Sequence, residues 1–193
     1  MTQNEHRYCA FFCNNFCDNN VSQLPATSLD LSVPFTPFHL GPGAVFKAIG
    51  GNRFSFMVFG GSQVLIDIEP GVRMLVDTSI FHGPSHSIAG AFIIGLVAAL
   101  IGKPISEFAL RLLRVRHVGI TWTASATGAF VGTFSHVFLD ALTHSDMSPW
   151  FPLASSNELL GFISLASLQI VCLVLGVIGG ILVLIRYKTR QNA

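Results

Sequence analysis

The apolar run from Leu159 to Ile185 restricts the fold of this chain more than any other feature of its sequence. It is 27 residues long, and Gln169 is its only strongly polar residue. An α-helix needs about 20 apolar residues to cross the hydrocarbon core of a bilayer. The run therefore predicts a transmembrane helix.

The composition of the whole chain agrees with a membrane protein. Hydrophobic residues make up 51% and charged residues 11% of the sequence, whereas about a quarter of the residues in a soluble domain are charged. The formal net charge is only +1, so no basic surface favours a nucleic acid. Membrane lipid is the partner that this composition predicts, and a nucleic acid is not expected.

Residues 118–135 predict a second, inner transmembrane helix. The segment has no charge and many small residues, with Gly128 and Gly132 four positions apart. This small-xxx-small spacing lets two helix backbones approach closely in a membrane.

Residues 85–102 are long enough for a third transmembrane helix. Pro84 favours a helix start, and Gly102 and Pro104 predict its end. The following segment, 103–117, alternates basic and apolar residues at helical spacing. It predicts a separate helix on the anionic inner leaflet, with a calmodulin-like partner site as the alternative.

Residues 38–68 hold two apolar segments, each too short to cross a membrane. A hairpin of two short helices, reversed at Gly50-Gly51-Asn52, would return Asp67 to the side on which His39 began. One irregular span would place His39 and Asp67 on opposite sides. We prefer the hairpin, because it brings nine of the eleven basic residues to one face.

These segments predict an all-α integral membrane helical bundle, with three full transmembrane helices and a short N-terminal helical hairpin. By the positive-inside rule the basic face is cytoplasmic, and so is the C-terminus. The nine basic residues are Lys47, Arg53, Lys103, Arg111, Arg114, Arg116, Arg186, Lys188 and Arg190.

Three regions are predicted along the chain. Residues 1–37 form a polar, disordered leader, 38–158 the membrane domain that carries the site, and 159–193 the last transmembrane helix with its basic tail. The role of three leader cysteines stays open between a metal stripe, an acylation or redox site, and no function: Cys9, Cys13 and Cys17.

Histidine and acidic residues from four separate segments fall at the opposite end of this bundle. Each alone could cap a helix or form a hydrogen bond between helices, but ionisable groups at membrane depth cost several kcal/mol and are functional by default. Imidazole and carboxylate ligands suit Zn²⁺, Mn²⁺ or Fe. The residues are His39, Asp67, Glu69, His82, His86, His136, Asp140, His144 and Asp146.

A divalent metal held by this set would lower the pKa of a bound water and polarise an ester or phosphoryl oxygen. Groups not needed as ligands could then act as a general base or orient the imidazoles. The residues considered for catalysis are Asp67, Glu69, His144 and Asp146. The sequence thus predicts a metal-dependent hydrolase, with zinc expected and manganese or iron as alternatives.

Five motifs, "TPFHLGPGA", "LIDIEP", "HGPSHS", "GTFSHVFLDALTH" and "PWFP", resemble the YdjM-like family of predicted membrane-bound metal-dependent hydrolases. The resemblance covers roughly residues 36–153. The expected substrate, a phospholipid or another phosphoester, follows from the predicted position of the cluster at headgroup depth, where a lipid phosphate would meet a cation. The resemblance implies a membrane-bound hydrolase, expected in a bacterial inner membrane. It also implies a set of metal ligands: His39, Asp67, His82, His86, His136 and Asp140.

Two other classes of function use the same residues. A transporter or a proton or metal conductor would place histidine and aspartate along a permeation path, although the residues gather at one end and the chain has no visible internal repeat. A structural protein would need them only as polar caps. The sequence leaves the substrate, the metal and the oligomeric state open.

Overall fold

The structure, a computed structural model, describes residues 37–76, 82–115 and 119–192. All of them belong to the second of two compact units, which runs from Pro34 to Ala193. Within these ranges every regular element is a helix and no strand occurs. The predictions for the leader and its three cysteines and for Arg116 fall outside the described residues.

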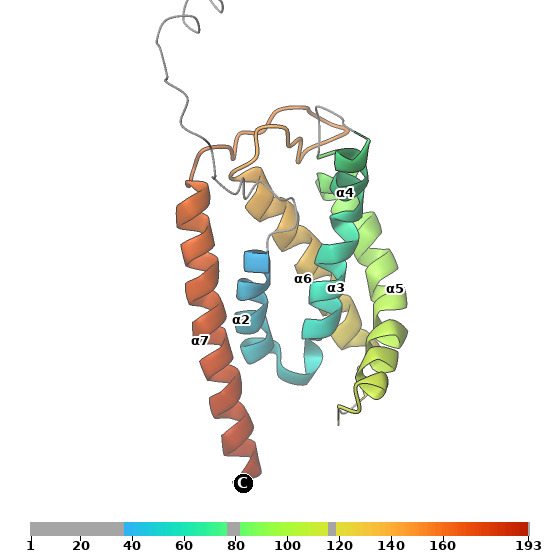
Figure 1. The fold of residues 1–193 in the computed structure, drawn as a ribbon, viewed down its shortest axis with the longest axis vertical. Coiled ribbons are helices and arrows are strands. Elements are labelled where there is room, and N and C mark those ends of the chain that lie inside the picture. Colours follow the sequence, from blue (N-terminus) through green and yellow to red (C-terminus); the bar gives the residue numbers. More distant parts are fainter. Residues whose placement is uncertain (1–36, 77–81, 116–118, 193) are drawn as a thin grey trace, which may run out of the picture. The chain divides into compact units, whose positions relative to one another are not determined.

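Six α-helices and three short 3₁₀ turns follow one another along the described chain (Figure 1). The turns are η1, η2 and η3, which lie before α2, between α2 and α3, and before α5. In chain order the elements are η1 (Pro37–His39), α2 (Leu40–Gly50), η2 (Gly51–Arg53), α3 (Phe56–Ile66), α4 (Ile68–Leu75), η3 (Pro84–His86), α5 (Ile88–Leu112), α6 (Trp122–Ala141) and α7 (Leu165–Gln191).

Two helices, α5 and α7, are long and apolar enough to cross a membrane. Most of the apolar window in each faces outward, since only 22% and 17% of the two windows is buried. The third full span, expected over 118–135, is not confirmed. The helix found there, α6, has 20 residues, and the residues that it buries inside the bundle include Ser125, Gly128, Gly132 and Thr133.

The segment 38–68 folds as two short helices, as the preferred interpretation predicted. Helix α2 ends at Gly50, the turn η2 follows, and α3 begins at Phe56. Gly51 has a φ of 54°, a backbone angle that glycine adopts without steric cost. The Lys47 ammonium stabilises the reversal by donating to the carbonyls of Gly51 and Phe54, each at 2.8 Å.

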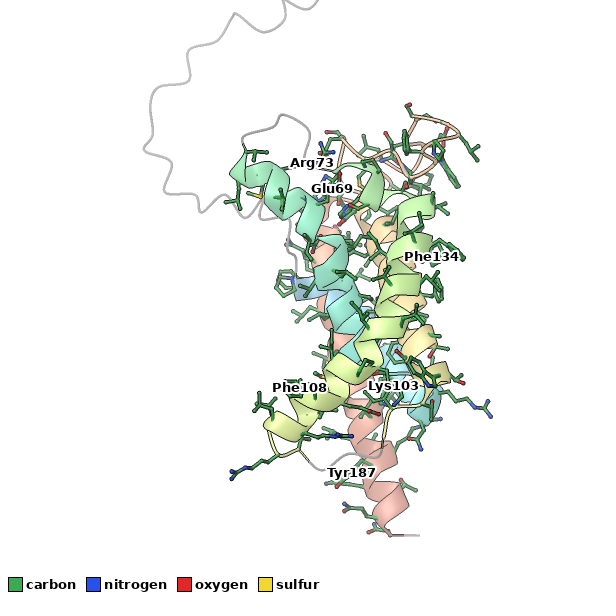
Figure 2. The ribbon with its side chains drawn as sticks, turned by 90° about the vertical axis from the view of Figure 1, so that its right-hand side faces the viewer. Glu69, Arg73, Lys103, Phe108, Phe134 and Tyr187 are labelled. Carbon is green, nitrogen blue, oxygen red and sulfur yellow. The ribbon has the colours of Figure 1, made fainter. Side chains whose placement is uncertain are left out.

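The predicted end of the 85–102 helix is wrong. Helix α5 continues through Pro104 to Leu112, so residues 103–112 extend a long helix and do not form a separate one on the membrane surface. An ion pair between Lys103 and Glu107, 2.7 Å apart, bridges the turn around the proline. Phe108, on this extension, is exposed and points away from the bundle (Figure 2).

The last helix begins later than its apolar run. Helix α7 starts at Leu165, because Gly161 takes a φ of 84° and Ser164 caps the helix by accepting a hydrogen bond from the Ser167 N–H. The residues from Leu159 to Ser164 therefore belong to the connection between α6 and α7. The apolar character of this run does not by itself mark where the helix begins.

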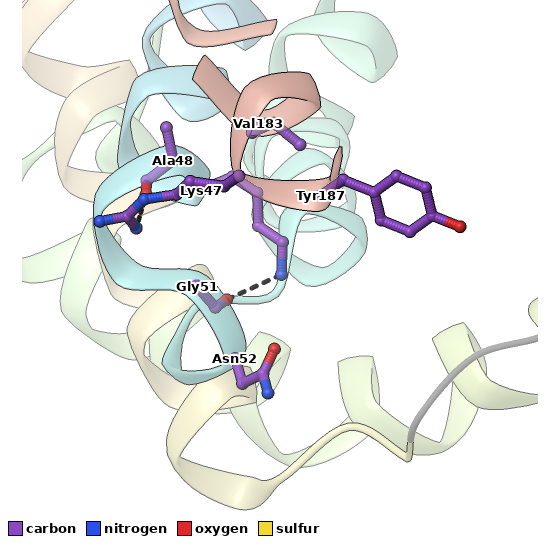
Figure 3. Close-up of a pocket in the computed structure, with 7 residues that line it drawn as sticks. Lys47, Ala48, Gly51, Asn52, Val183 and Tyr187 are labelled. Atoms are coloured by element: carbon purple, nitrogen blue, oxygen red, sulfur yellow. Dashed lines mark hydrogen bonds between the residues drawn. The ribbon is translucent and has the colours of Figure 1, made fainter. Parts of the chain in front are cut away.

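The helices pack as a three-helix group and a pair. Helix α5 packs on α6, α3 packs against both, and α7 packs chiefly on α2. Near the C-terminal end of α7 the Arg186 guanidinium donates to the carbonyls of Ala48 and Ile49, near the end of α2. Figure 3 shows the Lys47 side chain donating to the Gly51 carbonyl at the same end of α2. Lys47 and Arg186 thus both donate hydrogen bonds to backbone carbonyls at the C-terminal end of α2, where a helix leaves its carbonyls without partners.

The contact between α3 and α6 depends on two glycines of α6. A Cβ on Gly128 would meet the Ser55 carbonyl, and one on Gly132 would meet the Ser62 hydroxyl and the Phe59 carbonyl. The small-xxx-small spacing predicted from the sequence therefore marks the face on which α3 lies.

We expect Gly132→Ala to destabilise the protein by about 1–3 kcal/mol, because the added methyl group must force α3 and α6 apart. Gly61→Ala is the matched control, since a Cβ there meets nothing within 4 Å, and alanine favours a helix over glycine. Thermal unfolding in detergent measures both. Equal melting temperatures for the two variants would contradict this account of the packing.

Candidate metal centre

Three helical junctions bring four side chains together at one end of the bundle. Asp67 lies between α3 and α4, and its N–H donates to the Gln63 carbonyl at the end of α3. His86 is the last residue of η3. His136 and Asp140 lie one turn apart near the end of α6, on the same face, as their spacing predicted.

The turn that carries His86 is held by hydrogen bonds at both ends. The Ser87 hydroxyl accepts from the Gly90 N–H and donates to the Pro84 carbonyl, which fixes η3 to the start of α5. The Ile88 N–H donates to the Pro149 carbonyl in the connection after α6. These bonds hold the turn in place at the start of α5.

The ligand atoms of Asp67, His86, His136 and Asp140 all lie within 4.8 Å of one another. The His136 Nε2 atom is 3.0 Å from Asp67 Oδ1 and 3.0 Å from Asp140 Oδ2. The His86 Nε2 atom is 3.5 Å from Asp67 Oδ1 and 3.6 Å from Asp140 Oδ2. Two imidazole nitrogens and two carboxylates therefore converge on one small volume.

The converging atoms are buried and have no hydrogen-bond partner among the described residues. They include both oxygens of Asp67, Nε2 of His86, Nε2 of His136 and Oδ2 of Asp140. Their lone pairs face one another at short distances without the alignment of a hydrogen bond. A buried polar atom without a partner is costly, and a cation at the centre would satisfy all of these atoms, so the cluster could hold a metal ion.

The His86 ring is oriented by residues outside the cluster. Its Nδ1 atom is 2.9 Å from the Ser85 hydroxyl, which in turn lies 3.5 Å from the Ile66 carbonyl. If Nδ1–H donates to Ser85 and the hydroxyl donates to Ile66, the lone pair of Nε2 points into the cluster. Such outer contacts fix the tautomer of a metal-binding histidine.

Glu69, considered for catalysis from the sequence, binds Ser85 and Arg73 and is not one of the four residues that converge. Its Oε2 atom accepts from the Ser85 N–H at 2.8 Å, and its Oε1 atom accepts from the Arg73 guanidinium at 2.8 Å (Figure 2). Burial alone would raise the pKa of Glu69, but the bonds from Ser85 and Arg73 hold that pKa below its ordinary value. Glu69 is a carboxylate that positions Ser85.

His39 and His144 lie against the other oxygen of Asp140. Their Nε2 atoms are 3.6 Å and 3.9 Å from Asp140 Oδ1. His39 is buried, whereas 29% of the His144 side chain is exposed. Burial lowers the pKa of His144; Asp140 opposes this shift and His82 reinforces it.

His82 and Asp146 form a pair beside the cluster. The His82 Nδ1 atom is 2.9 Å from Asp146 Oδ1, and the His82 N–H donates to Asp146 Oδ2. The His82 ring packs against His86 and stacks on His144, with centroids 4.8 Å and 4.7 Å away. Of the six ligands implied by the resemblance, His82 and His39 are therefore neighbours of the four that converge.

Two residues that the sequence analysis did not single out hold this end of the bundle. The Gln63 amide donates to the His39 carbonyl at 3.2 Å, and the Asn157 amide donates to the carbonyls of Ala141 and His144. Gln63 lies one helical turn before Asp67, and that spacing is a signal which could have identified it. No local pattern marks Asn157.

The described fold and site define a helical membrane protein with a buried histidine and aspartate cluster that could bind a metal. The sequence profile of the YdjM inner membrane protein family matches residues 47–193, which is most of the chain. The chain belongs to this family, as the motifs predicted. The matched range includes α7 and begins after His39. Searches of curated proteins and of solved structures found no match.

We expect Ser85→Ala to weaken metal binding by about 10- to 100-fold, because the His86 ring loses the partner of its Nδ1 atom. Ser135→Ala is the matched control. Ser135 also stands one residue before a cluster histidine, but its hydroxyl bonds the Gly132 carbonyl of its own helix. Titration of the metal-free protein with zinc measures both affinities, and equal losses would contradict the role given to Ser85.

Proposed function

We propose that this protein is a membrane-bound, metal-dependent hydrolase of phosphoesters, with a lipid headgroup as its substrate. The observation that carries the proposal is the convergence of the four buried ligand atoms, without hydrogen-bond partners in the described chain, at one end of the helices. Mixed imidazole and carboxylate ligands favour zinc, with manganese or iron as alternatives.

The chain's own residues have separate tasks in this proposal. Asp67, His86, His136 and Asp140 hold the metal, and a bound divalent ion supplies Lewis acidity and a water of lowered pKa. Asp67 is thus assigned as a ligand. Ser85, held by Glu69, orients His86.

The pair of His82 and Asp146 is suited to accept a proton. With Nδ1–H donated to Asp146, the Nε2 atom of His82 keeps its lone pair, and that atom is buried with no hydrogen-bond partner in the described part of the chain. The neighbouring His144 is the most exposed imidazole of the group described here. We assign Asp146 and His144 to the catalytic surroundings of the metal on this basis.

An apolar surface near this end of the bundle supports a lipid as the substrate. A hollow of about 570 Å³ lies between the first turns of α5, Phe134 of α6 and the segment from Trp150 to Leu153. The connection before α7 also exposes Leu153 by 93% and Phe162 by 78%. Such side chains are stable at the boundary of headgroups and acyl chains.

The proposed topology has three spans, α5, α6 and α7, beside the short hairpin of α2 and α3. Lys47, Lys103 and Arg186 stand toward the end opposite the cluster, which the positive-inside rule places in the cytoplasm together with the C-terminus. The cluster then faces the other side of the inner membrane. A conducting role is less well supported, because the cluster residues gather at one end of the helices.

We expect the purified protein to retain a divalent metal and to hydrolyse bis-p-nitrophenyl phosphate or a fluorescent phospholipid in mixed micelles. His86→Ala and Asp140→Asn should lose the metal, and turnover should fall to the background rate. Elemental analysis and the hydrolysis assay measure the two effects on the same preparations.

Glu107→Gln is the matched control for Asp140→Asn. Glu107 binds Lys103 and the Ile120 N–H in the other half of the bundle, and glutamine can still accept these bonds. This variant should keep both metal and turnover. Hydrolysis that continues at the normal rate in a metal-free Asp140→Asn protein would refute the proposed function.

A further inference from the structure

The four converging residues are enough to fill the coordination sphere of one zinc ion. Zinc in proteins is most often tetrahedral, and a site with four protein ligands leaves no position for water, as in structural zinc sites. A hydrolytic ion keeps an open position. If the proposed function holds, the water must therefore bind at a position that these four side chains do not occupy.

The Asp140 carboxylate faces two different pairs of imidazoles. Its Oδ2 atom lies 3.0 Å from His136 Nε2 and 3.6 Å from His86 Nε2, inside the cluster. Its Oδ1 atom lies 3.6 Å from His39 Nε2 and 3.9 Å from His144 Nε2. A carboxylate arranged in this way can bridge two cations, with one oxygen on each.

The two imidazoles that face Asp140 Oδ1, those of His39 and His144, are not among the four residues that converge. The His39 side chain is only 4% exposed, its ring stands edge-on to His136 with centroids 5.0 Å apart, and its Nδ1 atom has no hydrogen-bond partner among the described residues. Its Nε2 atom is 3.6 Å from Asp140 Oδ1, which is longer than a hydrogen bond, and an ion between these two atoms would pair the carboxylate with the buried imidazole.

His144 approaches the same oxygen from the turn that follows α6. Its backbone N–H donates to the Asp140 carbonyl at 2.8 Å, and the Asn157 amide binds its own carbonyl, so its position relative to Asp140 is fixed. The ring is the partly exposed one of this group, and it stacks on His82. An ion bound here would be open to solvent on one side.

We propose that the centre binds two divalent ions, bridged by Asp140. The inner ion is held by Asp67, His86, His136 and Asp140 Oδ2. The outer ion is held by Asp140 Oδ1, His39 and His144. This inference rests on the proposed function and extends it.

The two positions differ in what they can do. The inner position is closed by four protein ligands and stabilises the two buried carboxylates. The outer position has three protein ligands, so it keeps room for a water and for a phosphoester oxygen. Pairs of ions about 3.5–4 Å apart serve this purpose in many phosphoester hydrolases, and the His82 ring, whose Nε2 atom is buried, stacks on His144.

The number of ions per chain tests the proposal directly. Full-length protein is purified in detergent, equilibrated with buffered free zinc and analysed for zinc and for protein. We expect two ions in the wild type, one in His144→Ala, one in His39→Ala and none in Asp140→Asn. An ion retained by His144→Ala and by His39→Ala is itself evidence that these two variants are folded.

Manganese provides a second, spectroscopic readout of the number of bound ions. The manganese-loaded wild type should give the electron paramagnetic resonance spectrum of two coupled ions, and His144→Ala should give the six-line spectrum of an isolated ion. One ion in the wild type, or an unchanged count in both histidine variants, would overturn the second position. If that single-ion protein still hydrolyses phosphoesters, the proposed function stands, whereas a metal-free wild type refutes both.

Discussion

Two buried carboxylates, those of Asp67 and Asp140, lie close together at one end of the bundle. The side chains around them must compensate the negative charge of both. Neither oxygen of Asp67 has a hydrogen-bond partner in the described part of the chain. Charges taken out of water without such partners are strongly destabilising. Two imidazoles next to them cannot satisfy every lone pair, whereas a divalent cation can. The free energy of metal binding would then contribute directly to the stability of this end of the fold.

The remainder of the bundle serves to bring these groups together. Glycines of α6 let α3 approach closely enough for Asp67 to reach His136. The hydrogen bonds of Ser87 fix the turn that carries His86, and Ser85 with Glu69 fixes the ring itself. At the opposite end of the bundle, Lys47 and Arg186 donate hydrogen bonds to backbone carbonyls at the end of α2. The charged groups named here therefore lie toward the two ends of the described helices.

Features encoded by local spacing were predictable from the sequence. His136 and Asp140 share a face because they are four residues apart in one helix, and the Gly50-Gly51-Asn52 turn reverses the chain as its residues indicate. The position of Asp67 near this pair was also predictable, because the preferred hairpin returns Asp67 to the end of the bundle at which His39 lies. The sequence also predicted His86 at this end of the bundle, and the resemblance to the family implied it as a ligand.

Features that depend on distant contacts were not predictable in the same way. A proline such as Pro104 usually ends a helix, but α5 continues through it to Leu112, with the ion pair of Lys103 and Glu107 spanning the proline. Glu69 is two residues from Asp67, and only the fold shows that it binds Ser85 and Arg73. The separation of His39 and His82 from the inner four likewise requires coordinates, because a sequence motif does not say which oxygen of Asp140 a ring will face.

X-ray absorption spectroscopy of the zinc-loaded, full-length protein tests the central claim most directly, because it reports the ligands of the bound ion. The account predicts a first shell of nitrogen and oxygen only, at about 2.0–2.2 Å, with the outer scattering of imidazole rings and no sulfur. A first shell that contains sulfur at about 2.3 Å would place the metal on cysteine. That result would contradict a centre built from Asp67, His86, His136 and Asp140.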